Sequence, residues 1–154
     1  MDPLDFYNLG KQLRSYTCPF PEALKRTIVG RIYYAIFLMV RDELGASLKG
    51  SYVEALYDSV SQKGVIHSLV IEALNKTDLD LHLRGVLSGM RRQRDYADYR
   101  IRTTKNWDIE INDIILMADT MLRSKSKLKP SFDQKICDIE SLVAEWHLKI
   151  AAKT

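Results

Sequence analysis

The sequence predicts an all-α helical bundle, and three observations predict it. Apolar residues recur at intervals of three and four along most of the chain, which is the period of a helix with one buried face. No stretch of useful length alternates polar and apolar residues, as a half-buried strand does. Seven glycines and four prolines among 154 residues leave little sequence for long loops. The chain has the length of one domain, and we expect residues 1–154 to form one.

Helix start and stop signals place the expected elements in order. A first helix over about 4–16 ends before Pro19 and Pro21, and a second begins near Pro21, a favoured residue of the first turn. This second helix ends near Leu44, before Gly45, and its apolar residues cover most of its circumference, so we expect it to be the buried central helix. Further helices are expected at about 52–60, 65–74 and 79–103, after the N-cap Asn106, and after Ser131.

The C-terminal region is expected to add a separate helix to the bundle. Residues 123–130, RSKSKLKP, read as a basic polar linker. Ser131 and Gln134 form a capping-box pattern, which predicts a last helix over about 131–152. The core of the domain is therefore expected over about 4–125. Thr77 or Asp78 is the expected N-cap of the helix that begins near residue 79.

Composition excludes several classes of protein. Apolar residues make up 46% and charged residues 28% of the chain, as in globular proteins, and no stretch approaches the ~20 apolar residues of a membrane span. The acidic first residues lack the apolar run of a signal peptide, so we expect a cytoplasmic protein. Cys18 and Cys137 lack metal-ligand spacing, and no HExxH pattern occurs, so neither a metal nor another cofactor is expected.

Positive charge is concentrated in one segment. The net charge is only +3, but residues 84–105 contain seven basic residues and two acidic ones. This segment therefore carries +5, and the rest of the chain carries −2. Within it, the stretch GMRRQRDYADYRIR (89–102) holds five arginines interleaved with tyrosines and aspartates. Local basicity of this kind is compatible with a nucleic-acid partner, although a charge run is usually a solvated face.

One arginine of this stretch occupies a position that should be apolar. On a helix, Arg94 fills the gap in a stripe formed by Leu83, Leu87, Met90, Ala97 and Ile101. Burying an unpaired guanidinium is costly, and Asp98 lies one turn further on, within reach of Arg94. Asp98 is therefore expected to be the structural ion-pair partner of the arginines. Asp95 stands four residues after Arg91.

Two interpretations of Arg94 follow from the residues. In the first, a buried ion pair fixes the packing of the helix. In the second, Arg94 faces a cleft or a second molecule, where its planar fork binds phosphate. Tyr96 and Tyr99 would then stack on a base or donate a hydroxyl, and the neighbouring arginines would supply the nucleic-acid-binding surface. These candidate nucleic-acid-binding residues are Arg91, Arg92, Arg100 and Arg102.

Two stretches together resemble a known family. RIYYAIFL (31–38) and LRGVLSGMRRQRDYADYR (83–100) resemble the small stand-alone members of the HEPN domain superfamily, over about residues 4–125. The resemblance implies an up-and-down bundle of four to five main helices, which commonly dimerises. In catalytic members, an arginine and a histidine four to six residues later meet their counterparts at the dimer interface and cut RNA without metal. Many of these proteins are toxins paired with a nucleotidyltransferase antitoxin or nucleases of defence systems, and others are non-catalytic.

The resemblance transfers to particular residues. Arg94 matches the motif arginine and Asp95 the polar residue that often follows it, while Tyr99 stands where the histidine is expected, so these three are the candidate catalytic residues. A tyrosine, with an ordinary pKa near ~10, is a poor base at neutral pH. Two functions therefore stay open. One is a metal-independent ribonuclease toxin that acts as a homodimer. The other is a non-catalytic module that binds RNA or nucleotide or serves as a helical protein scaffold.

Overall fold

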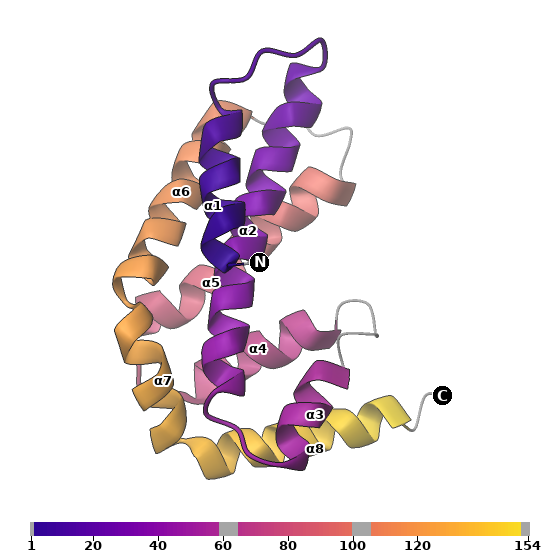
Figure 1. The fold of residues 1–154 in the computed structure, drawn as a ribbon, viewed down its shortest axis with the longest axis vertical. Coiled ribbons are helices and arrows are strands. Elements are labelled where there is room, and N and C mark those ends of the chain that lie inside the picture. Colours follow the sequence, from indigo (N-terminus) through magenta and orange to yellow (C-terminus); the bar gives the residue numbers. More distant parts are fainter. Residues whose placement is uncertain (1, 59–64, 100–105, 152–154) are drawn as a thin grey trace. The chain divides into compact units, whose positions relative to one another are not determined.

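The computed structural model of the chain describes residues 2–58, 65–99 and 106–151, and every regular element in those ranges is a helix (Figure 1). The predicted all-α class is therefore confirmed. None of the described helices is both long enough and apolar enough to cross a membrane. The elements in chain order are α1 (Pro3–Leu13), α2 (Pro21–Gly45), α3 (Ser51–Asp58), α4 (Val65–Lys76), α5 (Leu81–Tyr99), α6 (Trp107–Arg123), α7 (Lys125–Gln134) and α8 (Ile136–Ala151).

The helices divide between two compact units. The first unit comprises Met1–Met39 and Gly85–Arg123, and the second comprises Val40–Arg84 and Ser124–Thr154. The boundary falls inside α2 and inside α5, so each of these helices contributes residues to both units. The first unit thus contains α1, most of α2 and α5, and α6, and it includes every predicted site residue that the structure describes.

The first unit is built from α1, α2, α5 and α6; in Figure 1, α1, α2 and α6 run side by side and α5 crosses behind α2. Contacts between α1 and α6 pair early residues of one helix with late residues of the other, so these two helices are antiparallel. Tyr7 contacts Asp119, and Arg14 contacts Asn112. Helices α2 and α5 are also antiparallel, since the start of α2 meets the end of α5.

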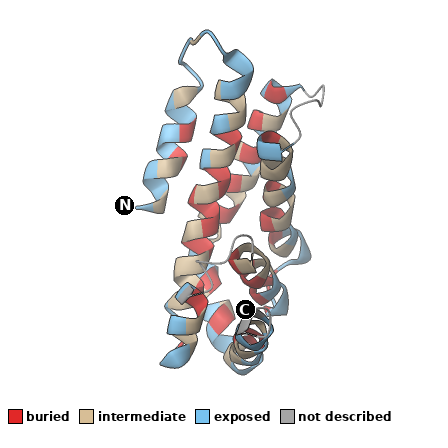
Figure 2. Cartoon of the chain, turned by 90° about the vertical axis from the view of Figure 1, so that its right-hand side faces the viewer, coloured by how far each residue is buried: buried red, intermediate tan, exposed pale blue. Residues whose placement is uncertain are grey.

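Helix α2 is buried along most of its length in the first unit, as its apolar residues predict (Figure 2). Ile32, Tyr33 and Ile36 have no exposed surface, and Ile28 is only 2% exposed. Helix α1 approaches α2 closely at Gly10, where an added Cβ atom would lie 2.8 Å from Ile32 Cγ1. Because Ile32 is enclosed, this contact requires the absence of a side chain at Gly10.

The hydroxyl group of Tyr7 fastens α1 to α6. It donates a hydrogen bond of 2.5 Å to Asp119 Oδ1, and the side chain is buried. Burial, followed by the hydrogen bond to Asp119 and the charge of Asp119, raises the pKa of Tyr7 to about 12. The folded state therefore favours the neutral phenol relative to the unfolded chain, whose tyrosines ionise near pH ~10. The resulting stabilisation is complete below about pH 10 and is lost as the pH rises towards 12.

Tyr7→Phe is expected to lower the free energy of unfolding by about 1–2 kcal/mol at pH 8, because it removes a hydrogen bond to a charged group. The difference between wild type and variant should shrink as the pH rises from 10 to 12, since the tyrosine of the unfolded wild-type chain then ionises while that of the folded chain stays neutral until about pH 12. Urea unfolding monitored by far-UV circular dichroism at pH 8 and above pH 11 measures this difference in the free energy of unfolding. A difference that is the same at pH 8 and above pH 11 would contradict this role of Tyr7.

The second unit packs α8 against α3, α4 and α7. The indole N–H of Trp146 donates to Glu72 Oε2 on α4 at 3.1 Å, and Lys135 forms an ion pair of 2.9 Å with Asp78. Leu128 and Phe132 of α7 have no exposed surface. These contacts give the C-terminal helices a core within the second unit.

The prediction of a linker over residues 123–130 is wrong, because α6 continues to Arg123 and α7 occupies Lys125–Gln134. Leu128 and Phe132 lie one turn apart, and their burial stabilises a helix whose other residues, apart from Pro130, are polar. The chain tolerates Pro130 inside this helix. Ser131 is not an N-cap, since its hydroxyl donates to the Lys127 carbonyl one turn earlier, and the last helix begins at Ile136.

The predicted N-caps have mixed outcomes. Asn106 caps α6 as predicted, since its side chain accepts a hydrogen bond of 3.2 Å from the backbone N–H of Asp108. The cap of α5 is Asp80, whose side chain accepts from the backbone N–H of His82 at 2.8 Å. The prediction of Thr77 or Asp78 for this role is therefore wrong. Thr77 is buried and donates to the Leu74 carbonyl at the end of α4 instead.

Candidate functional site

Arg94 lies on α5 in the seam that the sequence predicts, and its side chain is 16% exposed. The apolar seam residues Leu83, Leu87, Met90 and Ala97 are buried. Two carboxylates hold its guanidinium. Nε lies 2.6 Å from Asp98 Oδ2, but its N–H is not aimed at that oxygen, so this contact is an ion pair and not a hydrogen bond. Nη1 donates to Asp95 Oδ1 at 3.3 Å. Asp98 therefore occupies the structural position that the spacing predicts.

Two tyrosine rings also contact the Arg94 guanidinium. Its carbon atom Cζ lies 5.5 Å from the ring centre of Tyr34 on α2 and 5.3 Å from that of Tyr99, both within range of a cation–π interaction. Nη2 donates a long hydrogen bond of 3.4 Å to the Tyr34 hydroxyl. The fold thus brings the stretch RIYYAIFL together with the stretch that ends in ADYR, at Tyr34 and Arg94. We call Arg94, Asp95, Asp98, Tyr34 and Tyr99 the Arg94 cluster.

The electrostatics of the cluster favour a permanently charged arginine. Desolvation acts to lower the pKa of Arg94, but the charge of Asp98, the two tyrosines and the hydrogen bond to Asp95 together raise it above its ordinary value. Tyr33, next to the cluster, is fully buried. Burial raises the pKa of Tyr33 far above its ordinary value, against the opposing charges of Arg91 and Arg94. Tyr33 therefore stays neutral at any physiological pH.

Arg26 of α2 holds the end of α5 and is a residue that sequence reasoning missed. Its Nη1 donates to the Ala97 carbonyl at 2.8 Å and to the Tyr96 carbonyl at 3.4 Å. Its guanidinium lies 4.7 Å from the ring centre of Trp107, and its Nη2 pairs with Glu22 at 2.7 Å. The spacing of Glu22 and Arg26 is visible in the sequence, but the carbonyl acceptors are on another helix. Arg26 thereby fixes the segment that carries Asp98 and Tyr99.

The surroundings of the cluster offer both charge and an exposed ring. Arg92 is exposed, Arg91 is half-buried, and Tyr99 is 70% exposed. The side chain of Asp95 is 46% exposed. The other two candidate nucleic-acid-binding residues, Arg100 and Arg102, lie outside the described residues, as does the seam residue Ile101. Arg31 is exposed with its guanidinium over the ring of Phe6, 5.6 Å from the ring centre.

The chemistry available in the first unit is limited by its side chains. The sequence of this unit contains no histidine, since His67, His82 and His147 all belong to the second unit. Over the described ranges, no three His, Cys, Asp or Glu side chains are grouped so that they could hold a metal ion. What the cluster offers is a fixed guanidinium for a phosphate oxygen and an exposed tyrosine ring for a base.

Comparisons with known proteins add one relative. The chain is similar to an uncharacterised protein of Methanocaldococcus jannaschii, with 27% identity over 162 aligned residues that cover 94% of this chain and 90% of that protein. No family model and no solved structure matches the chain. The similarity extends over both units.

Proposed function

We propose that this protein binds RNA as a HEPN-type homodimer, through the face of α5 that carries the Arg94 cluster. One observation carries the proposal: a guanidinium held in place by two carboxylates lies within 5.3 Å of the ring centre of Tyr99, which is 70% exposed. A fixed fork beside an exposed aromatic ring is suited to a nucleotide, because the fork binds the phosphate and the ring stacks on the base.

Charge distribution supports a polyanionic ligand. Residues 84–105 carry +5 while the rest of the chain carries −2, so the attraction is local to α5 and to the residues that follow it. Exposed arginines such as Arg92 can neutralise backbone phosphates without reading the sequence. The resemblance of these two stretches to HEPN proteins, whose catalytic members act on RNA through the motif arginine that Arg94 matches, supports the same assignment.

Binding without cleavage is the activity that the side chains support. Metal-free RNA cleavage uses a base and an acid that exchange protons near neutral pH, and histidine is the usual choice. The first unit has no histidine, and Tyr99 stands at the motif position. The cluster therefore has the groups to hold a phosphate and a base, and the first unit supplies no histidine as a proton carrier.

Incubation of the pure protein with end-labelled single-stranded RNA in EDTA tests this function. We expect a complex that forms without shortening of the RNA, and whose affinity falls steeply with salt. Arg92→Ala should weaken binding and lower the slope of log K against log salt by about 0.7, the value for one phosphate contact on a single strand. Arg123→Ala, an exposed arginine in the last turn of α6, is the matched control and should leave both unchanged.

The outcomes separate the candidate functions. Cutting in EDTA that is lost in Arg94→Ala would replace binding by ribonuclease activity at the same cluster. Absence of any complex at low salt would overturn the proposal and leave a role in protein–protein assembly. Light scattering on the same samples tests the dimer, for which the expected mass is twice that of the 17.8 kDa chain.

A further inference from the structure

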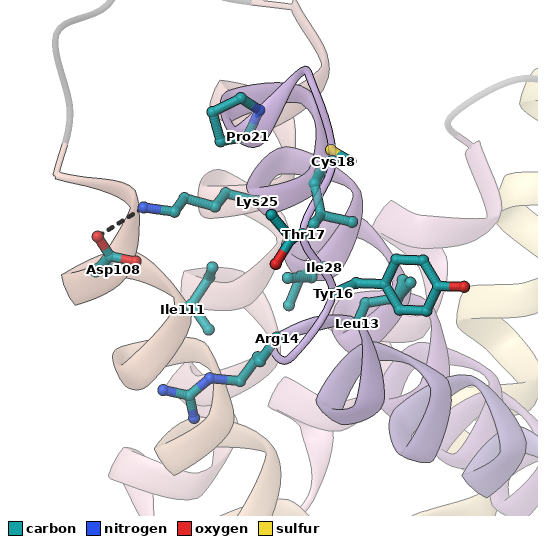
Figure 3. Close-up of a pocket in the computed structure, with 11 residues that line it drawn as sticks. Leu13, Arg14, Tyr16, Thr17, Cys18, Pro21, Lys25, Ile28, Asp108 and Ile111 are labelled. Atoms are coloured by element: carbon teal, nitrogen blue, oxygen red, sulfur yellow. Dashed lines mark hydrogen bonds and ion pairs between the residues drawn. The ribbon is translucent and has the colours of Figure 1, made fainter.

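A cavity of about 260 Å³ opens beside the connection between α1 and α2, in the first unit (Figure 3). Its lining comes from the end of α1, the connection itself, the first turns of α2, and α6. It shares no residue with the Arg94 cluster. The volume lies just below the range of about 300–1,000 Å³ that is usual for small-molecule sites, so it suits a ligand with a one- or two-ring body.

The inner wall of the cavity is apolar. Ile28 of α2 and Ile111 of α6 are 2% and 3% exposed, and Leu13 and Leu24 are half-buried beside them. These four side chains offer a hydrocarbon surface that a flat or aliphatic group could cover. An apolar wall of this kind with a few polar groups at its edge is the usual composition of a small-molecule site.

The charged groups of the cavity lie on its α6 side, as Figure 3 shows for Lys25, Asp108 and Arg14. Lys25 Nζ is 2.7 Å from Asp108 Oδ2, and Arg14 Nη2 donates to Asn112 Oδ1 at 2.9 Å. Two cations against one carboxylate leave the edge with a net charge of +1. Asn112 is a neutral acceptor, so it does not neutralise the guanidinium of Arg14.

Two helix ends add to this positive potential. Pro21 begins α2 and Asp108 is the second residue of α6, and both line the cavity. The N-terminal ends of helices carry partial positive charge, which favours an anion over a cation of the same shape. The carboxylate of Asp108 already neutralises part of this positive potential, so one further negative charge would balance the charges at the edge of the cavity.

From this combination we propose that the cavity binds a small amphipathic monoanion, an aryl or alkyl carboxylate or sulfonate. Its apolar body covers Ile28, Ile111 and Leu13, and its anionic group lies between Arg14 and Lys25. This activity is separate from RNA binding, because the two sites share no residue.

Cys18 provides a reporter inside the site. Its thiol is free, half-buried and part of the cavity lining, while Cys137, also free, is exposed in the second unit. A bound ligand should hinder alkylation of Cys18 and leave Cys137 as an internal control. Peptide mass spectrometry after a timed exposure to iodoacetamide gives the rate for each cysteine separately.

The experiment uses the full chain and 1-naphthoate as the probe, with 1-naphthylmethanol as the neutral analogue. We expect millimolar 1-naphthoate to slow alkylation of Cys18 at least threefold with no effect on Cys137, and the alcohol to protect much less. Arg14→Gln and Lys25→Gln should each weaken protection by 1-naphthoate at least fivefold in concentration. Thr17→Trp, which fills the cavity while keeping both cations, should abolish the effect of the probe.

Several results would overturn the proposal. Equal protection by the acid and the alcohol would show that the negative charge of the ligand is not needed. Equal slowing of alkylation at Cys18 and Cys137 would show an effect outside the cavity. Protection that survives in both glutamine variants, with circular dichroism showing wild-type helix content, would exclude Arg14 and Lys25 as the anion site. We expect saturating 1-naphthoate to leave RNA binding unchanged. Loss of RNA binding in its presence would show that the two sites are not separate.

Discussion

Arg94→Ala is expected to weaken binding of single-stranded RNA about 10- to 100-fold, because a hydrogen bond to a charged group contributes about 1.5–3 kcal/mol and ~1.4 kcal/mol is a factor of ten. Arg94→Lys should recover only part of this loss, since an ammonium keeps the charge but cannot reproduce the fork. Electrophoretic mobility shift or fluorescence anisotropy at fixed salt measures both variants. The lysine variant thus separates charge from geometry at the same position.

A folding control accompanies Arg94→Ala because its side chain is 16% exposed and contacts both α2 and α5. Asp98 and Asp95 keep access to water when Arg94 is removed, so we expect the free energy of unfolding, measured in urea, to fall by only about 1–2 kcal/mol. Wild-type helix content with much weaker RNA binding is the expected combination. Undiminished RNA binding by a folded Arg94→Ala variant would move the site away from the cluster.

Arg26→Ala is expected to lower the free energy of unfolding by about 2–4 kcal/mol, the sum of charged hydrogen bonds to carbonyls and of the contact with an aromatic ring. The two carbonyls are those of Tyr96 and Ala97, and the ring is that of the buried Trp107. Amide hydrogen exchange in the last turn of α5 should accelerate as well, since that turn loses its anchor on α2. Urea unfolding and exchange mass spectrometry measure the two effects.

Glu22→Gln is the matched control for Arg26→Ala. It removes the exposed ion pair with Arg26 but leaves the carbonyl contacts in place, so it should cost less than about 1 kcal/mol. RNA affinity should fall in Arg26→Ala, although Arg26 is not proposed to touch RNA, because Tyr99 and Asp98 follow the anchored carbonyls. If Glu22→Gln were as destabilising as Arg26→Ala, the ion pair and not the carbonyl contacts would be the source of the stability.

The sequence predicts those features that depend on the spacing within one helix. The seam with Arg94 among apolar residues, and Asp98 one turn later, can be placed on a helical wheel without knowledge of any other helix. The same holds for the buried face of α2, where Ile28, Ile32 and Ile36 recur at intervals of four. The burial of Ile28, Ile32 and Ile36 agrees with the prediction that this helix is buried.

The features that the sequence did not predict depend on partners from other helices. Arg26 finds carbonyl acceptors on α5, and nothing in its own neighbourhood indicates which helix will end beside it. In the sequence, Tyr34 stands among the apolar residues of α2, but its hydroxyl and ring contact Arg94 on α5. In α7, two apolar residues give too weak a periodic signal, and it is the burial of Leu128 and Phe132 within the second unit that stabilises the helix.

The close approach of Gly10 to Ile32 fixes the distance between α1 and α2 at this point. Tyr7 lies one turn before Gly10 and Arg14 one turn after it, and both side chains reach α6. A methyl group at position 10 would push α1 away from Ile32. The displacement of α1 would move Tyr7 relative to Asp119 and Arg14 relative to Asn112. Gly10 therefore determines whether the phenol of Tyr7 and the guanidinium of Arg14, which lines the proposed anion cavity, can form their hydrogen bonds with α6.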